Sequence, residues 1–369
     1  MGTRDCVKFR RTSVPLLVLM GLAASAPGLA QQTRGKKLPV VWVLAMGGTI
    51  AGRGASPTDL SNYKSGTLSG EEIVRSVPQL EQVADVKVEQ IVNVPSPNIT
   101  LANWVTLANR INEIFLKDSS AAGIVVTHGT NTLEETAYFL NLTIKDDRPV
   151  VVVGAMRPAT AISSDGPLNL LNAVRTAVAP EARGKGVLIV LNEEINGARD
   201  ATKTDTHRVE TFRAPELGFL GYVDDDKVSF YRSSTRRHTV NSEFNVSGIK
   251  QLPSVEIIYS YVEPSTTALR PLLCSSVQGI VFAGTGTGDI SSFEKAAIRS
   301  MLASPATSRP VLVRASRVGN GRVTSIEELD RLGMISADNL NPQKARILLM
   351  LALTKTTDAK QIQRMFAEY

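Results

Sequence analysis

Cysteine is almost absent from this chain, which holds only Cys6 and Cys274 among 369 residues. Cys6 precedes an apolar run in a segment that we expect to be removed, so one cysteine remains and no intrachain disulfide can form. Long apolar runs are also missing beyond the N-terminus. The sequence therefore predicts a soluble mature protein, stabilised by packing alone and without a spanning helix.

The N-terminal segment has the composition of a secretory signal peptide. Arg4, Lys8, Arg10 and Arg11 precede an apolar stretch over residues 14–24, and small residues follow up to Ala30. This pattern predicts cleavage after residue 30, export to the periplasm or the medium, and no membrane attachment afterwards. The arginine pair leaves twin-arginine export open as a minor alternative.

Aromatic residues are scarce, at 5% of the chain, and no basic run is interleaved with them. The formal net charge of +6 falls to +3 when residues 1–30 are removed. A weak charge without a basic and aromatic patch argues against nucleic-acid binding.

Several catalytic signatures are missing. The three histidines (His128, His207 and His238) have no metal-binding spacing, and no GxSxG elbow is present. The glycine loop over residues 284–288 lacks the lysine of a phosphate-binding loop and the spacing of a dinucleotide fingerprint. The sequence therefore predicts no metal and no cofactor.

The most informative stretch that is present is LPVVWVLAMGGTIAGRG, residues 38–54. Its unbroken apolar run is typical of a parallel strand covered on both faces, and we expect it to be central in its sheet. The run ends at Gly47, Gly48 and Thr49. Ligands of parallel sheets bind beyond the carboxyl ends of the strands, so Thr49 is a candidate for chemistry.

Alternating strands and helices predict an α/β fold with two domains: a larger N-terminal domain with a doubly wound, mainly parallel sheet, and a smaller C-terminal α/β domain. We expect domains at residues 36–235 and 253–369, joined by a linker over 236–252.

In the first domain we expect strands at 86–92, 122–126, 149–153 and 187–191, and helices at 70–76, 101–115 and 133–144, with another helix from Pro167. In the second we expect strands at 255–261, 279–283 and 310–315, and helices at 291–302 and, last in the chain, 342–353.

Two local features bear on the candidate site. Thr132 and Glu135 have the spacing of a capping box at the start of the helix over 133–144. Residues 52–70 are polar and rich in glycine and serine, which is typical of a mobile loop that closes over a site. Tyr63 lies within this loop, and its phenol can meet Thr49 on closure.

Hydroxyl groups at strand ends remain as candidates for catalysis. Thr49, Ser96 and Thr130 follow predicted strands, and Lys203 lies in a polar segment after the strand predicted over 187–191. A threonine hydroxyl is a poor nucleophile unless a neighbour accepts its proton. Two threonines and a lysine therefore suggest a relay between hydroxyl and amine groups.

Five motifs resemble the secreted bacterial L-asparaginases and glutaminase-asparaginases. They are AMGGTIAG at 45–52, THGTNTLEETAYFL at 127–140, GAMRPATAISSDGPLNL at 154–170, GARDATKT at 197–204 and LNPQKARILLMLALTKT at 340–356. The resemblance runs from about residue 39 to residue 369, and HTVNSEF at 238–244 favours the glutaminase-asparaginase branch.

The resemblance implies hydrolysis of the side-chain amide of asparagine, with glutamine as a second candidate substrate, by a homotetramer whose sites form between subunits. It assigns Thr49 as nucleophile with Tyr63 beside it, and Thr130 with Lys203 as the second catalytic pair. It assigns Ser96 to the α-carboxylate of the substrate. Backbone amides near Thr130 are candidates to stabilise the oxyanion.

The chain departs from the family where the α-ammonium group is bound. Asn131 replaces an aspartate that contacts this group and adjoins the lysine, and Pro97 replaces a Gln or Glu that also helps to bind it. Thr287 replaces an asparagine supplied by the partner subunit, and Met46 a common threonine. Glu327 and Glu328 are candidates for the partner's glutamate. The departures predict retained hydrolysis with looser recognition.

Two other functions remain open. A binding protein that kept the pocket and lost turnover would not need Thr49, Thr130, Lys203 and Tyr63 together. An enzyme that uses a dinucleotide on the doubly wound sheet would retain its cofactor during purification, and the glycine spacings do not favour it.

Overall fold

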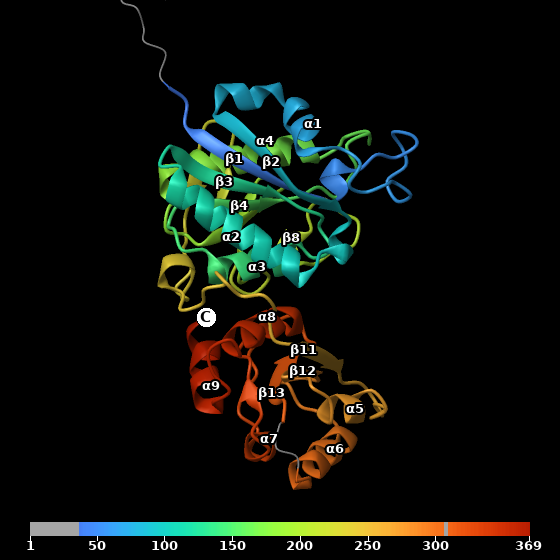
Figure 1. Ribbon diagram of the computed structural model, residues 1–369. Helices are drawn as coiled ribbons and strands as arrows, with labels where there is room; N and C mark the ends of the chain where they lie inside the picture. The colour runs from blue at the N-terminus through green and yellow to red at the C-terminus, as the bar shows by residue number, and fades with distance from the viewer. Residues whose placement is uncertain (1–36, 306–308) are drawn as a thin grey trace, which may run out of the picture. The chain divides into compact units, whose positions relative to one another are not determined.

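The apolar runs of the N-terminal half form neighbouring strands of one sheet in the computed structural model, which describes residues 37–305 and 309–369 (Figure 1). The predicted signal peptide, residues 1–30, lies outside the described residues. Within them, Leu38–Tyr369 form one compact unit. No helix of the described ranges combines the length and the apolar character needed to cross a membrane.

The larger sheet has eight strands in the order β10-β9-β6-β5-β4-β3-β1-β2. Its strands are β1 (Val40–Gly47), β2 (Asp85–Val94), β3 (Ala121–Thr127), β4 (Val150–Val153), β5 (Val187–Leu191), β6 (Glu194–Gly197), β9 (Gly221–Val223) and β10 (Val228–Phe230). Neighbours from β2 to β5 are parallel, and β6, β9 and β10 pair antiparallel. The mainly parallel sheet is confirmed. β1 lies between β3 and the edge strand β2, so it has a parallel neighbour on each side, as expected for a buried strand that is not at the edge of its sheet.

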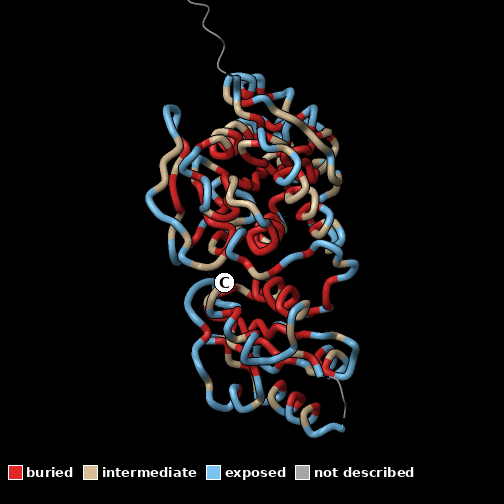
Figure 2. Tube along the Cα trace, turned by 60° about the vertical axis from the view of Figure 1, so that its left-hand side comes forward, coloured by how far each residue is buried: buried red, intermediate tan, exposed pale blue. Residues whose placement is uncertain are grey.

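Helices cover both faces of this sheet (Figure 1). α1 (Gly70–Arg75) and α4 (Gly166–Val178) pack on one face, and α2 (Leu101–Lys117) and α3 (Leu133–Thr143) on the other. Successive strand residues point to opposite faces, and here both are apolar: Val150 and Val152 join one core while Val151 and Val153 join the other. Double coverage explains the unbroken apolar runs: β1, β3, β4 and β5 are almost entirely buried, whereas β2 and β10 contain no buried residue. Figure 2 shows the buried segments in red, inside an exposed surface in pale blue.

The C-terminal part contains a parallel sheet in the order β11-β12-β13-β14. Its elements are β11 (Val255–Tyr259), α5 (Leu269–Leu273), β12 (Gly279–Gly284), α6 (Ser292–Ala303), β13 (Val311–Ser316), α7 (Glu327–Arg331), β14 (Ile335–Ser336), α8 (Pro342–Ala352) and α9 (Ala359–Glu368). The smaller α/β domain is confirmed. The expectation that α8 is the last helix is wrong, because α9 follows and buries Ile362, Met365 and Phe366.

The predicted capping box at Thr132 and Glu135 is also wrong. Thr132 is the N-cap of α3, but its side chain makes no capping bond. Its hydroxyl instead donates to the backbone oxygen of Ser96, 2.9 Å away. A hydroxyl has one hydrogen to donate. The hydrogen bond from Thr132 to Ser96 therefore connects the start of α3 to the turn after β2.

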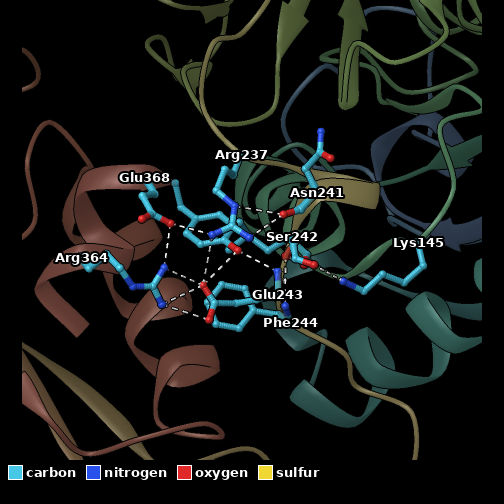
Figure 3. Close-up of polar contacts among 10 residues, drawn as sticks. Lys145, Arg237, Asn241, Ser242, Glu243, Phe244, Arg364 and Glu368 are labelled. Carbon is cyan, nitrogen blue, oxygen red and sulfur yellow. Dashed lines mark hydrogen bonds and ion pairs between the residues drawn. The ribbon is translucent and has the colours of Figure 1, made fainter. Parts of the chain in front are cut away.

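A charged network joins the segment before β11 to α9 (Figure 3). Arg237 donates to Glu368 at 2.6 Å, and Arg364 contacts Glu368 at 2.7 Å and Glu243 at 3.1 Å. Lys145, just beyond α3, donates to the backbone oxygen of Ser242 at 2.5 Å. These contacts join the segment around residues 237–243 to α9 and to the chain just beyond α3.

Candidate active site

The turn after β1 holds Thr49 in a buried position. Gly47 and Gly48 have φ angles of 92° and 88°, a region that glycine enters without strain. A short 3-10 helix over Thr49–Ala51 follows at once. The Thr49 side chain is therefore fixed at the strand end with 6% of its surface exposed.

The turns after β1 and β3 touch through their backbones. A Cβ atom built on Gly48 would lie 2.3 Å from the Cα of Gly129, so neither position has room for a side chain. A Cβ on Gly129 would lie 2.8 Å from the hydroxyl oxygen of Ser96. Thr49 and Thr130 each follow one of these glycines. The close approach therefore brings Thr49, Ser96 and Thr130 together at the carboxyl ends of the parallel strands.

Tyr63 reaches Thr49 from the loop over residues 52–70. Its hydroxyl oxygen lies 2.6 Å from Oγ1 of Thr49, within hydrogen-bond distance. The loop closes on itself through a bridge between Arg53 and Lys64. Gly52 makes room for the ring, because a Cβ there would meet the Cδ2 atom of Tyr63 at 2.8 Å.

Lys203 bonds to both Thr130 and Asn131. It lies in β7 (Thr202–Lys203), which pairs antiparallel with β8 (Phe212–Arg213). Its Nζ donates to Oγ1 of Thr130 and to Oδ1 of Asn131, both at 2.9 Å. A hydroxyl, an amide and an amine from distant parts of the sequence therefore form one cluster.

Burial lowers the pKa of the Lys203 ammonium below its usual value, and the negative charge of Asp205 partly opposes this shift. The Asp205 carboxylate is held by the backbone amides of Arg208 and His207, which lower its own pKa. A lysine with a lowered pKa is more often neutral, and a neutral amine can accept a proton from a hydroxyl.

His128 supports the turn after β3, a role that the sequence reasoning missed. Its Nδ1 lies 2.7 Å from the backbone oxygen of Gly129, and its Nε2 lies 2.9 Å from Oγ1 of Thr136. Trp104 donates to Thr136 at 2.7 Å. Complete burial lowers the pKa of His128 to about 4, so the ring is neutral at ordinary pH. Nδ1–H therefore donates to the Gly129 carbonyl and orders the turn that carries Thr130.

Other candidates from the sequence lie elsewhere. Glu328 pairs with Lys295 and Arg299, and Glu327 pairs with Arg331. Thr287 lies in the turn between β12 and α6. Residues 37–305 and 309–369 contain no group of three or more His, Cys, Asp or Glu side chains placed to hold a metal ion.

Two family models match the chain. The model described as "Asparaginase, N-terminal" matches residues 40–236, and the model described as "Glutaminase/Asparaginase C-terminal domain" matches residues 254–366. The chain belongs to the asparaginase family.

Similar asparaginases extend over nearly the whole chain. "Probable L-asparaginase periplasmic" of Haemophilus influenzae is 45% identical, over 97% of this chain and 99% of that protein. "Glutaminase-asparaginase" of Pseudomonas fluorescens biotype A is 44% identical, over 97% of this chain and 99% of that one. The solved structure of "Probable Cytoplasmic L-asparaginase from Campylobacter jejuni" has a TM-score of 0.86 at 45% identity, and the match covers 90% of this chain and all of that one.

Proposed function

We propose that this member of the asparaginase family hydrolyses the side-chain amide of L-asparagine, and also that of L-glutamine, to the acid and ammonia. The observation that carries the proposal is the Thr49–Tyr63 contact at 2.6 Å together with the Lys203–Thr130 bond at 2.9 Å. Each hydroxyl has a partner that can exchange its proton, as an activated nucleophile requires. The names of the relatives supply the substrate class.

The chemistry proceeds in two halves. Oγ1 of Thr49 forms a bond to the amide carbon, and its proton passes through the neighbouring hydroxyl and amine groups to the amide nitrogen. The C–N bond then breaks, ammonia leaves, and an acyl group remains on Thr49. Water attacks that ester, the acid leaves, and the proton returns to Thr49. In this proposal Thr130 and Lys203 activate the water.

Substrate binding involves Ser96 and Asn131 in this proposal. Ser96 holds the α-carboxylate, while Asn131 lies where an aspartate of the family contacts the α-ammonium. Loss of a charge-assisted hydrogen bond typically costs about 1.5–3 kcal/mol, or about ten- to a hundredfold in binding. Because Pro97 also lacks a polar group, we expect looser discrimination for the α-ammonium.

The experiment is ammonia release from asparagine, glutamine and amides that lack the α-amino group, measured with the purified protein. Hydrolysis that disappears in Thr130→Val supports the proposal. Binding measured by calorimetry without ammonia release overturns it and supports a binding homologue instead. Strict preference for substrates with an α-ammonium group would contradict the loosened recognition.

We further propose an exported homotetramer. Residues 1–30 act as the signal peptide, the mature protein reaches the periplasm, and two domains at 36–235 and 253–369 are joined by a linker at 236–252. In this proposal a partner subunit completes each site by supplying its Thr287 and a glutamate. N-terminal sequencing of the exported protein and sedimentation equilibrium test these statements.

A further inference from the structure

A fully buried ammonium group connects α8 to both halves of the candidate active site. Lys344 is 1% exposed. Its Nζ donates to the backbone oxygen of Arg199 at 2.8 Å and to that of Ala201, and it lies 3.8 Å from Oε2 of Glu134. These partners lie in two segments outside α8, so Lys344 makes tertiary contacts and none of them is a contact within its own helix.

Both segments lead directly to catalytic candidates. Glu134 is in the first turn of α3, four residues after Thr130. Ala201 precedes Lys203 by two residues, at the entrance to β7. Thr130 and Lys203 must approach to 2.9 Å, although 73 positions separate them in the sequence. One ammonium group therefore holds the two segments whose side chains have to meet.

The rest of the α8 N-terminus supports the same carboxylate. Asn341 donates to Oε2 of Glu134 at 3.2 Å, and Gln343 donates to Oε1 at 3.3 Å. Glu134 is 6% exposed, so an unpaired negative charge there would be costly. Burial lowers the pKa of Lys344 to about 8, with Glu134 opposing the shift, so the lysine is mainly charged at neutral pH.

We propose that Lys344 is a positioning residue for amide hydrolysis: its ammonium fixes the segment before Lys203 against the start of α3 and thereby sets the Lys203–Thr130 contact. The inference rests on the proposed function. Displacements of about 1 Å in catalytic groups reduce rates about a hundredfold. The motif LNPQKAR contains Lys344 but contributes no side chain to the cluster around Thr49 and Thr130. In this proposal its role is to hold the segments that carry Thr130 and Lys203.

The test compares Lys344→Met with the double variant Lys344→Met/Glu134→Gln, which removes both charges. The matched control is Arg314→Met. Arg314 is another fully buried cation of the C-terminal part, paired with Asp330 at 2.9 Å and outside the candidate site. Steady-state kinetics, thermal unfolding, and amide hydrogen exchange of peptides covering residues 130–135 and 197–204 are measured on each protein.

We expect kcat to fall about ten- to a hundredfold in both Lys344 variants, with KM changed less than about threefold. Hydrogen exchange should accelerate in the two peptides. The double variant should regain thermal stability and not kcat, because the carbonyls of Arg199 and Ala201 remain without their donor. Arg314→Met should lose stability while kcat and the two peptides stay unchanged.

Recovery of kcat together with stability in the double variant would overturn the inference, as would unchanged exchange in both peptides. If Lys344→Met does not fold, the double variant and Lys344→Arg, which keeps the charge, are compared instead. Their kcat values and the hydrogen exchange of the two peptides then decide. If the wild-type protein releases no ammonia, the proposed function fails, and the exchange data alone decide whether Lys344 holds the segments.

Discussion

Lys203 donates a 2.9 Å hydrogen bond to Asn131, whose acceptor is an amide oxygen and carries no charge. The charge that raises the pKa of Lys203 is instead that of Asp205, which only partly offsets the lowering by burial. This arrangement favours a neutral amine beside Thr130. It also leaves the proposed substrate site without the negative charge that an aspartate at position 131 would supply.

Asn131→Asp should reverse both effects. A carboxylate beside the amine favours the ammonium form and raises the pKa of Lys203, so the acidic limb of the kcat profile should move to higher pH, by about one unit. The KM for asparagine should fall about tenfold or more, because the α-ammonium gains a charged partner. Asp205→Asn is the companion variant and should move the acidic limb to lower pH. If the acidic limbs of Asn131→Asp and Asp205→Asn moved in the same direction, this explanation would be refuted.

The pKa of His128 predicts a pH dependence of stability. Burial lowers this pKa to about 4 in the folded protein, against an ordinary value near 6.5. The unfolded chain therefore binds more protons between these values, and the stabilisation lost through His128 grows as pH falls from about 6.5 towards 4. Denaturant unfolding of His128→Gln should show a shallower decline over this range than the wild type. His207→Gln, at an exposed position, should follow the wild-type curve.

The backbone contact between Gly48 and Gly129 predicts an unusually damaging alanine substitution. A methyl group at Gly48 would overlap the Gly129 backbone, so Gly48→Ala should separate the turns and lower kcat/KM about a hundredfold or more. Gly248→Ala is the control, because Gly248 has a similar φ of 77° with no atom near its missing Cβ. It should cost about 1 kcal/mol of stability and leave activity intact. Equal effects of the two substitutions would mean that backbone strain alone is responsible.

The network in Figure 3 should contribute little to stability. Arg364 and Glu243 are partly exposed, at 42% and 27%, and such pairs typically contribute less than about 1 kcal/mol. Arg364→Met should therefore change the free energy of unfolding by less than that amount, with the difference shrinking in high salt. A loss of several kcal/mol would show that the network anchors α9.

Much of the sheet could be predicted from the sequence because its strands are buried on both faces. Val150 to Val153 and Val187 to Leu191 are short unbroken apolar runs, a pattern that is typical of strands covered on both faces. The site residues could be placed because Thr49 and Thr130 follow such runs, whereas Ser96 follows β2, an edge strand with a mixed sequence. Their roles in catalysis and binding stay predictions.

The failures have physical causes. Thr132 has a local capping pattern, but a tertiary acceptor on Ser96 takes its hydroxyl hydrogen. The signal for α9 was present, since Ile362, Met365 and Phe366 have helical spacing. The Lys344–Glu134 pair joins residues 210 positions apart, and no local pattern reveals such a contact. The histidine spacing bears only on metal binding, whereas complete burial makes His128 a neutral hydrogen-bond donor to the Gly129 carbonyl.

Ammonia release by Thr49→Ala and Thr49→Ser is the sharpest test of the proposed mechanism, in which Oγ1 of Thr49 is the attacking atom. The alanine variant should lose at least about a thousandfold in kcat/KM for asparagine, while the serine variant, which keeps a hydroxyl, should retain a measurable part of the activity. Both should melt near the wild-type temperature. A folded Thr49→Ala protein that releases ammonia within tenfold of the wild-type rate would contradict the account.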